Sequence, residues 1–334
     1  MPPTLFLPFY DDSYYKPGGP VFLYIGGETS GEYRFSNLQM GIIQILMEAT
    51  NGLGVILENR YYGEGYPFAS STTDELRFLT TEQSYYHRQC LFAQHANFPT
   101  VNASLNAPNT PWILYGGSLA GAQTAFSLKT YGGDNGILWG GIASSGTTRT
   151  ELAYVEWYDP IQKYGPQGCV GGINAIIDKI DFVRSTGNAT AVREMEAVFG
   201  LEALENDADF AMTIASPLGG PMFYPTNTWQ GLNWTPEYNS EDFWYFCSNV
   251  TNLDAPGKNT QIDYSLAQYT NWEPWTNLGN YANYITQHII PLCYGAAINS
   301  TACFGTQNES YWAETSNSGS RSYLYSTCTE TGIY

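Results

Sequence analysis

The chain has 334 residues, of which 43% are hydrophobic and 13% are charged, and its formal net charge is −18. Because binding to phosphate groups depends on clustered Lys and Arg, this acidity argues against a nucleic-acid partner. No stretch approaches the roughly 18 apolar residues of a membrane span, so no membrane partner is expected. The length suits one large domain with an insertion, or two domains, and the 27 Tyr and 9 Trp are typical of extracellular hydrolases.

The first half of the chain alternates short apolar segments with segments of helical spacing. Apolar runs that end in glycine-rich turns predict strands within 20–28, 54–65, 111–118 and 137–146. Apolar residues three or four positions apart predict helices over 35–52, 80–98 and 119–132. Continuous apolar strands separated by helices indicate an α/β fold with a parallel sheet covered on both faces.

The second half of the chain has a different character. Two apolar stripes within 171–204 predict amphipathic helices, and 277–295 predicts a further helix ended by Pro291. Between them, residues 216–275 are rich in Pro, Gly, Trp and Tyr and show few clear strands. We therefore expect 151–334 to form a mainly helical module attached to the sheet of 1–150.

Ser118 stands where a predicted strand meets a predicted helix. In "GGSLAG" the neighbours of Ser118 are Gly116, Gly117, Ala120 and Gly121, all small. A nucleophile elbow requires small neighbours because the strand and helix backbones nearly touch around the exposed serine. The position predicts a nucleophilic serine, whereas a phosphate-binding turn is disfavoured because no Lys follows the glycines.

Two backbone groups are predicted to stabilise a negatively charged oxygen near Ser118. The N–H of Leu119 begins the predicted helix, where unpaired N–H groups and the helix dipole favour an anion. The second donor is expected in the "IGGE" turn, from the N–H of Gly27 or Glu28.

Cysteines and glycosylation motifs indicate an oxidising compartment. The six cysteines are widely spread without a C-x-x-C pair, and Cys293 and Cys303 are close enough for a small disulfide loop. Six N-x-[ST] motifs favour a glycosylated, secreted protein. They lie at Asn102, Asn188, Asn233, Asn249, Asn299 and Asn308. "MPPTLFLPFYDDSYY" lacks the pattern of a signal peptide, so we expect a mature or truncated chain.

Five motifs in order resemble one family of serine peptidases. They are "KPGGPVFLYIGGE", "ENRYYGEGYPF", "FLTTEQ", "PWILYGGSLAGAQTAFSLKTYGG" and "GGIASSG". The family includes lysosomal Pro-X carboxypeptidase, dipeptidyl peptidase II and the fungal acid prolyl endopeptidases, and the chain is most similar to the last. The resemblance implies an α/β-hydrolase core, a helical cap inserted after the sixth strand, cleavage after proline, and Ser118 as nucleophile.

Two departures from the family pattern matter. "SYYHRQCL" is more polar and bulkier than the family's helix there, so Cys90 is expected to be a free thiol or a sequence error rather than a disulfide partner. The family also keeps its catalytic Asp and His beyond the point that corresponds to Tyr334. The resemblance thus implies that the C-terminal part of the core lies outside this chain, in a further segment or a second polypeptide.

No histidine or aspartate of the chain is a clear partner for Ser118. His87 and His95 precede it beside a helix and lack the i, i+4 spacing of a helical zinc pair. His288, in a cap-like helix, is the only histidine after Ser118 and is a weak candidate for the base. The conceivable orienting carboxylates are more typical of turns and caps; they are Asp134, Asp159 and Asp254.

The "NRYYGEG" segment and the cap tryptophans are the candidate substrate contacts. Tyr61, Tyr62 and Glu64 either border the substrate cleft or form a structural turn under the serine loop. A pocket for proline needs an apolar slot, and several tryptophans of the second half could line it or be core. They are Trp229, Trp234, Trp244, Trp272 and Trp275.

These observations predict a serine peptidase that cleaves on the carboxyl side of proline and is active at acidic pH. We expect it outside the cell or in an acidic vacuolar or lysosomal compartment. The substrates would be proline-containing peptides or proteins, and the chemistry needs no metal or cofactor. An esterase or lipase would share the serine motif, and a truncated, catalytically silent binding protein is the third alternative. Endopeptidase or exopeptidase action and a dimeric state are left open.

Overall fold

The computed structural model describes residues 9–134, 136–151, 155–218, 242–252, 260–293 and 301–332; side chains are not described at 85–88, 157, 242 and 260. Several residues named above therefore lie outside the described part. They are the His87 side chain, Asn233, Asn299, Trp229, Trp234 and Asp254. The chain divides into two compact units, one of residues 1–154 and 310–334 and the other of residues 155–309.

The first unit is built on a five-stranded sheet with the order β1-β3-β2-β4-β5. Four strands run parallel, and β1 pairs antiparallel with β3 at one edge. The strands are β1 (Phe9–Asp11), β2 (Val21–Ile25), β3 (Leu53–Leu57), β4 (Trp112–Gly117) and β5 (Gly140–Ser144). The predicted parallel sheet is confirmed, and β1 is an additional edge strand that the sequence pattern did not reveal.

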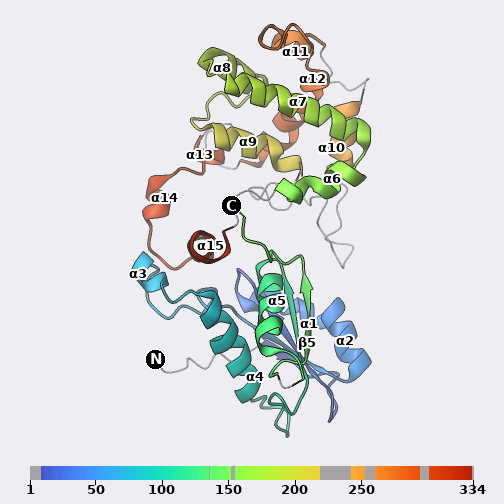
Figure 1. Ribbon diagram of the computed structural model, residues 1–334, viewed down its shortest axis with the longest axis vertical. Helices are drawn as coiled ribbons and strands as arrows, with labels where there is room; N and C mark the ends of the chain where they lie inside the picture. Colours follow the sequence, from blue (N-terminus) through green and yellow to red (C-terminus); the bar gives the residue numbers. More distant parts are fainter. Residues whose placement is uncertain are drawn as a thin grey trace. The chain divides into compact units, whose positions relative to one another are not determined.

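Helices cover both faces of this sheet, as Figure 1 shows for α5 and α2. The helical elements between residues 9 and 134 are η1 (Gly31–Arg34), α1 (Ser36–Gln39), α2 (Ile42–Thr50), α3 (Thr73–Leu76), η2 (Gln83–Cys90), α4 (Leu91–His95) and α5 (Leu119–Tyr131). The side chains of β2 alternate between the two cores. Leu23 packs with η2, α4 and α5, whereas Phe22 packs with α1 and α2. The arrangement is an α/β-hydrolase type of layering with a mixed sheet.

Two predicted helices differ from the observed ones. The helix expected over 35–52 is broken between α1 and α2, because Met40 is extended and Gly41 has a φ of 84°. A positive φ is accessible to glycine but interrupts a right-handed helix. The helix expected over 80–98 ends at His95 and is wound as a π-helix over η2.

The end of the described chain returns to the first unit. Its elements are α15 (Gly319–Ser326) and the π-helical turn η9 (Thr327–Thr331). Arg321 Nε donates to the carbonyl of Ser71 at 2.5 Å, and Thr81 N–H donates to Glu330 Oε2 at 2.9 Å. The predicted division placed all of 151–334 in the helical module, whereas the compact units place 310–334 with the sheet.

Every described element of the second unit is a helix or a helical turn. They are η3 (Val155–Tyr158), α6 (Asp159–Tyr164), α7 (Gln167–Ser185), α8 (Ala189–Val198), α9 (Asp207–Ala215), η4 (Ser216–Leu218), α10 (Asp242–Thr251), α11 (Thr260–Ser265), η6 (Ala267–Tyr269), α12 (Leu278–Tyr284), η7 (Ile285–Ile289), η8 (Ile290–Leu292) and α13 (Thr301–Phe304). A further helix, α14 (Glu309–Ala313), begins at the division between the units. The stripes predicted within 171–204 are the buried faces of α7 and α8.

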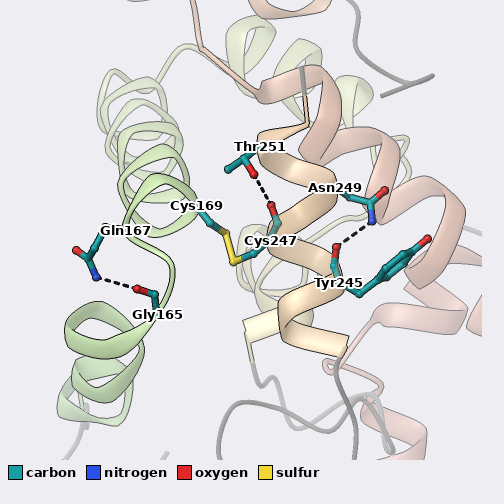
Figure 2. The surroundings of a disulfide bond; sticks show 7 residues. All are labelled: Gly165, Gln167, Cys169, Tyr245, Cys247, Asn249 and Thr251. Atoms are coloured by element: carbon teal, nitrogen blue, oxygen red, sulfur yellow. Dashed lines mark hydrogen bonds between the residues drawn. A yellow bond between two sulfur atoms is a disulfide. The ribbon is translucent and has the colours of Figure 1, made fainter. Parts of the chain in front are cut away.

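Two disulfides stabilise the second unit. Cys169 of α7 is joined to Cys247 of α10, as Figure 2 shows. The predicted Cys293–Cys303 bond is also present, and Cys90 is a buried free thiol, one of the two alternatives that the sequence left open. Among the helices that the structure describes, none is both long and apolar enough to cross a membrane.

Candidate active site at the carboxyl end of strand β4

Ser118 occupies the corner between β4 and α5. Its backbone angles are φ 56° and ψ −123°, and its side chain is exposed. Its N–H donates to the carbonyl of Ser144 at 3.1 Å, and its own carbonyl accepts from Ala122 N–H at 3.1 Å. A positive φ at a residue other than glycine is strained and persists only where the surroundings impose it. The structure therefore has the backbone turn that the sequence predicted for an elbow; the nucleophilic role of Ser118 stays a prediction.

Three glycines make this turn possible. A methyl group placed on Gly116 would lie 2.1 Å from the carbonyl oxygen of Ala120, and one on Gly121 would lie 2.3 Å from that of Ser144. A methyl group on Gly146 would lie 2.7 Å from the carbonyl carbon of Gly121. Each obstacle is backbone, which cannot rotate away as a side chain would. The elbow therefore depends on glycine at these positions, and Gly146 of the next loop is a member that the sequence motif did not contain.

The predicted oxyanion donors come to the same end of the sheet. Leu119 is the first residue of α5, where a helix has N–H groups without intrahelical partners. Gly27 follows β2 with a φ of 73°, and a methyl group on it would lie 4.0 Å from the Cβ of Ala120. The "IGGE" turn thus lies against the first turn of α5. Donation from Leu119 and from Gly27 or Glu28 to an oxyanion is a prediction that this arrangement permits.

A buried amide pair links that turn to α5. Asn59 Nδ2 donates to the carbonyl of Gly27 at 3.0 Å and to Gln123 Oε1 at 3.0 Å. Asn59 follows β3, and both amide side chains are buried. No local sequence pattern predicts this pair, because Asn59 and Gln123 are 64 positions apart.

Glu28 and Tyr62 form the titratable part of the site. Burial raises the pKa of the Glu28 carboxyl above 4.5, opposed by a hydrogen bond from its own backbone N–H and by the charge of Arg34. Burial also raises the pKa of Tyr62, and the charge of Glu28 raises it further. Arg34 Nε in turn donates to the carbonyl of Gly26 at 3.2 Å. The carboxyl in the turn after β2 therefore retains its proton above the usual range, and the phenol of Tyr62, in the turn after β3, stays neutral.

A cavity of about 690 Å³ opens beside Leu119. Its wall includes Tyr62, Gln123 and Phe126, and η9 contributes Glu330. All of its lining residues belong to the first unit. The contribution of the chain's end to this wall was not expected from the sequence, which placed that segment in the helical module.

The three candidate contacts of "NRYYGEG" have different surroundings. Tyr62 lines the cavity. Tyr61 does not line it and is fully buried; its hydroxyl donates to the carbonyl of Glu75, and its ring meets Tyr66 edge to face. Glu64 is exposed, and its N–H donates to the buried Glu58 carboxylate at 2.8 Å. Contact with substrate stays a prediction for all three, and the geometry favours Tyr62.

The histidines and aspartates named above are spread over the described structure. His95 is exposed at the end of α4, and His288 of the second unit lies against the rings of Tyr284 and Tyr245. Asp134 lies in an exposed turn, and Asp159 is the first residue of α6. In the described part, no hydrogen bond joins the Ser118 hydroxyl to a histidine side chain.

The described tryptophans of the second unit also differ in burial. Trp275 is fully buried, and its indole N–H donates to Thr270 Oγ1 at 2.8 Å, so it belongs to the core. Trp244 and Trp272 are exposed. Among the described residues, no three His, Cys, Asp or Glu side chains gather in a way that could hold a metal ion.

Comparison with known proteins links this site to serine peptidases. The sequence model of the family Peptidase_S28, described as serine carboxypeptidase S28, matches residues 8–334. A probable extracellular serine carboxypeptidase of Arthroderma benhamiae is 35% identical over 97% of this chain and 45% of its own length. Serine protease vicPa of Bipolaris victoriae is 26% identical over 89% of this chain and 54% of its own.

A more distant relative extends the comparison to animals. The thymus-specific serine protease of Homo sapiens is 24% identical over 97% of this chain and 58% of its own length. The chain therefore spans about half the length of the curated relatives it matches.

Proposed function

This chain belongs to the S28 family of serine peptidases, and we propose that Ser118 is the nucleophile with which it hydrolyses peptide bonds on the carboxyl side of proline. The observation that carries the proposal is the strained, exposed Ser118 at the strand-to-helix corner. Ser118 has Leu119 N–H beside it and the Gly27–Glu28 turn against the first turn of α5. Membership of a serine peptidase family makes a nucleophilic serine expected, and the strand-to-helix corner supports the choice of Ser118.

The chemistry follows from the roles of a nucleophilic serine. The Ser118 hydroxyl attacks the scissile carbonyl carbon, and its proton passes to a histidine base that an aspartate orients. The carbonyl oxygen becomes an oxyanion, which the N–H groups at Leu119 and in the Gly27–Glu28 turn stabilise. The C–N bond then breaks, the amine leaves with the proton from the base, and water releases the acyl group from Ser118 by the reverse sequence.

The cavity beside Leu119 supports a preference for proline. A proline ring needs a shallow apolar wall, and Tyr62, Leu79 and Phe126 supply aromatic and aliphatic surface there.

The proposal of activity at acidic pH has separate support. The raised pKa of Glu28 and the isoelectric point near 4.3 both suit a protein that works with many of its carboxylates protonated.

The decisive experiment replaces the nucleophile. Ser118→Ala in the full-length protein should abolish hydrolysis of a proline-containing chromogenic peptide near pH 4 to 5, because removing a triad member costs on the order of 10⁶ in kcat. Labelling by a fluorophosphonate probe should disappear with it, while thermal unfolding stays unchanged. A variant that keeps more than a few per cent of activity, in a preparation free of other peptidases, would contradict the proposal. Comparable peptides without proline test the specificity.

We propose further that the base and the orienting acid come from chain outside these 334 residues, in the same or a second polypeptide. The length of the curated relatives and the open edge at β5 support this. In the described part β5 pairs only with β4, and its central residue Ile142 is 38% exposed. Residues 1–334 alone should therefore hydrolyse the peptide only feebly and aggregate readily. Robust Ser118-dependent activity from a monodisperse monomer of 1–334 would contradict this.

We also propose that the protein is secreted, with glycans on most of its six N-x-[ST] motifs. The extracellular relative and the two disulfides support an oxidising route. Asn102, Asn188 and Asn308 are exposed, whereas the Asn249 amide donates to the carbonyl of Tyr245 within α10 (Figure 2). After expression in a eukaryotic secretory host, glycosidase treatment should lower the apparent mass. An unchanged mass would argue against secretion by this route.

A further inference from the structure

We propose that Asn59 is a positioning residue that orients the peptide group between Gly27 and Glu28, so that the Glu28 N–H, rather than that of Gly27, is the second oxyanion donor. The inference rests on the proposed role of Ser118. It also resolves an alternative that the sequence left open, because the sequence could not distinguish the two N–H groups of the turn.

The direction of the Glu28 N–H follows from the geometry of one peptide group. The carbonyl of Gly27 and the N–H of Glu28 belong to the same planar, trans unit, so they point in opposite directions. Asn59 Nδ2 holds that carbonyl at 3.0 Å. Fixing the carbonyl on Asn59 therefore fixes the direction of the Glu28 N–H on the opposite side. Gly27 itself has a φ of 73°, which glycine adopts without the cost that other residues would meet.

The Glu28 N–H is not used in a backbone–backbone hydrogen bond of the described chain. It interacts with the carboxyl of its own side chain and lowers the pKa of that group, against the larger effect of burial. The N–H is therefore not committed to another backbone group, and we infer that it can be offered to an oxyanion.

The Asn59 side chain is itself held in place by α5. Its side chain is buried, and Nδ2 uses its second hydrogen on Gln123 Oε1 at 3.0 Å. Gln123 lies on α5, the helix that begins at Leu119. One amide nitrogen therefore ties the turn after β2 to the helix that supplies the first donor. Only a side chain with two N–H hydrogens at this reach can hold both oxygens, and a carboxylate there would repel them.

The experiment measures catalysis in the full-length protein after removing the two donors. Asn59→Asp keeps the shape, and Asn59→Leu removes the donors without adding a charge. Loss of one oxyanion donor costs about 10²–10³ in kcat, so we expect kcat to fall about 100-fold in each variant, with KM changed less than about threefold. The inhibition constant of a peptidyl boronic acid, whose adduct with Ser118 is tetrahedral, should rise in parallel.

The matched control is Glu58→Gln, one position earlier. The Glu58 carboxylate accepts from Gly31 N–H at 2.9 Å and from Glu64 N–H at 2.8 Å, and so ties the same two loops through these N–H groups rather than through the carbonyl of Gly27. An amide keeps one of the two acceptor oxygens. We expect this variant and the Asn59 variants all to lose stability, because each loses hydrogen bonds between the two loops, but Glu58→Gln should keep kcat and the boronic-acid affinity within about threefold.

The outcomes separate this inference from the proposed function. If Ser118→Ala remains active, the proposed function fails. If Ser118→Ala is inactive but a folded Asn59 variant keeps kcat within about threefold of the original, the inference alone fails. It fails equally if Glu58→Gln shows the same loss of kcat and boronic-acid affinity, or if neither Asn59 variant folds, because Asn59 would then have only a structural role.

Discussion

Adding one methyl group to Gly116 should destroy the Ser118 corner, whereas the same change at Gly117 should be tolerated. A methyl group on Gly116 would lie 2.1 Å from the carbonyl oxygen of Ala120 and 2.6 Å from Thr124 Oγ1. The shorter distance is roughly 1.4 Å inside the ~3.5 Å at which non-bonded heavy atoms are attracted. On Gly117 the same group would have no neighbour within 4 Å. Two adjacent glycines thus differ only in what surrounds them.

The expected size of the effect comes from the nature of the obstacle. Overpacking costs about 1–3 kcal/mol when side chains can adjust, and the obstacle at Gly116 is the backbone of α5. We therefore expect Gly116→Ala to cost at least about 3 kcal/mol, which lowers Tm by about 6–12 °C for a unit of this size. Gly117→Ala should stay within about 0.5 kcal/mol.

Thermal unfolding and fluorophosphonate labelling of Ser118 measure the two consequences of this change. Gly116→Ala should unfold earlier and label more slowly, and Gly117→Ala should retain both the Tm and the labelling rate. If the two variants behave alike, or if Gly116→Ala retains the original Tm and labelling rate, the close approach of β4 and α5 does not govern this corner.

Two predictions concern the second unit. Removing the Cys169–Cys247 disulfide by Cys169→Ser should lower the free energy of unfolding by about 4.5 kcal/mol, and removing Cys293–Cys303 by Cys293→Ser should lower it by about 2.7 kcal/mol. The first loss is larger because the joined residues are 78 rather than 10 positions apart. Denaturant unfolding measures both losses, and equal losses would contradict the prediction. Trp275→Ala should cost about 3–5 kcal/mol because that side chain is fully buried, whereas Trp272→Ala, 77% exposed, should change the free energy of unfolding by less than about 0.5 kcal/mol.

Local sequence signals were sufficient for the sheet and the corner. The strands β2 to β5 are short apolar runs, and small residues end or directly follow β2, β4 and β5. That pattern depends only on neighbours in the chain. The corner at Ser118 was predictable for the same reason, since its small neighbours lie within three positions. The edge strand β1 has only three residues and half-exposed side chains, so it carries no comparable periodicity.

Long-range pairings were not accessible in this way. Asn59 and Gln123 meet across 64 positions, and Cys169 and Cys247 across 78, and no spacing rule selects such partners. The return of α15 to the first unit depends on contacts such as Arg321 with Ser71, 250 positions away. Each of these depends on the packed structure rather than on a local pattern. The break between α1 and α2 is different, because Gly41 is visible in the sequence as a residue that can interrupt a helix. The apolar periodicity on both sides of Gly41 nevertheless led to the prediction of one continuous helix.

We expect the Glu28 carboxyl to make both the free energy of unfolding and kcat decrease as the pH rises, because its surroundings raise its pKa. Its pKa is raised in the folded state, mainly by burial, while Arg34 opposes the shift; the neighbouring Tyr62 and Tyr323 stay neutral because their own pKa values are raised. Below pH 4.5 the carboxyl is protonated in both the folded and the unfolded protein. As the pH rises above 4.5 and through the folded-state pKa, the unfolded state releases its proton first, so the free energy of unfolding falls.

Replacing Glu28 by Gln removes this dependence and gives the test. The Tm of Glu28→Gln should be close to that of the original protein at pH 4 and increasingly above it toward pH 7. The same protonation should affect catalysis, because an ionised carboxyl accepts more strongly from the Glu28 N–H and competes with an oxyanion for it. The high-pH decline of kcat should therefore move upward in Glu28→Gln. A Tm difference that is constant from pH 4 to 7 would show that this carboxyl titrates as it does in the unfolded chain, and the competition argument would fail with it.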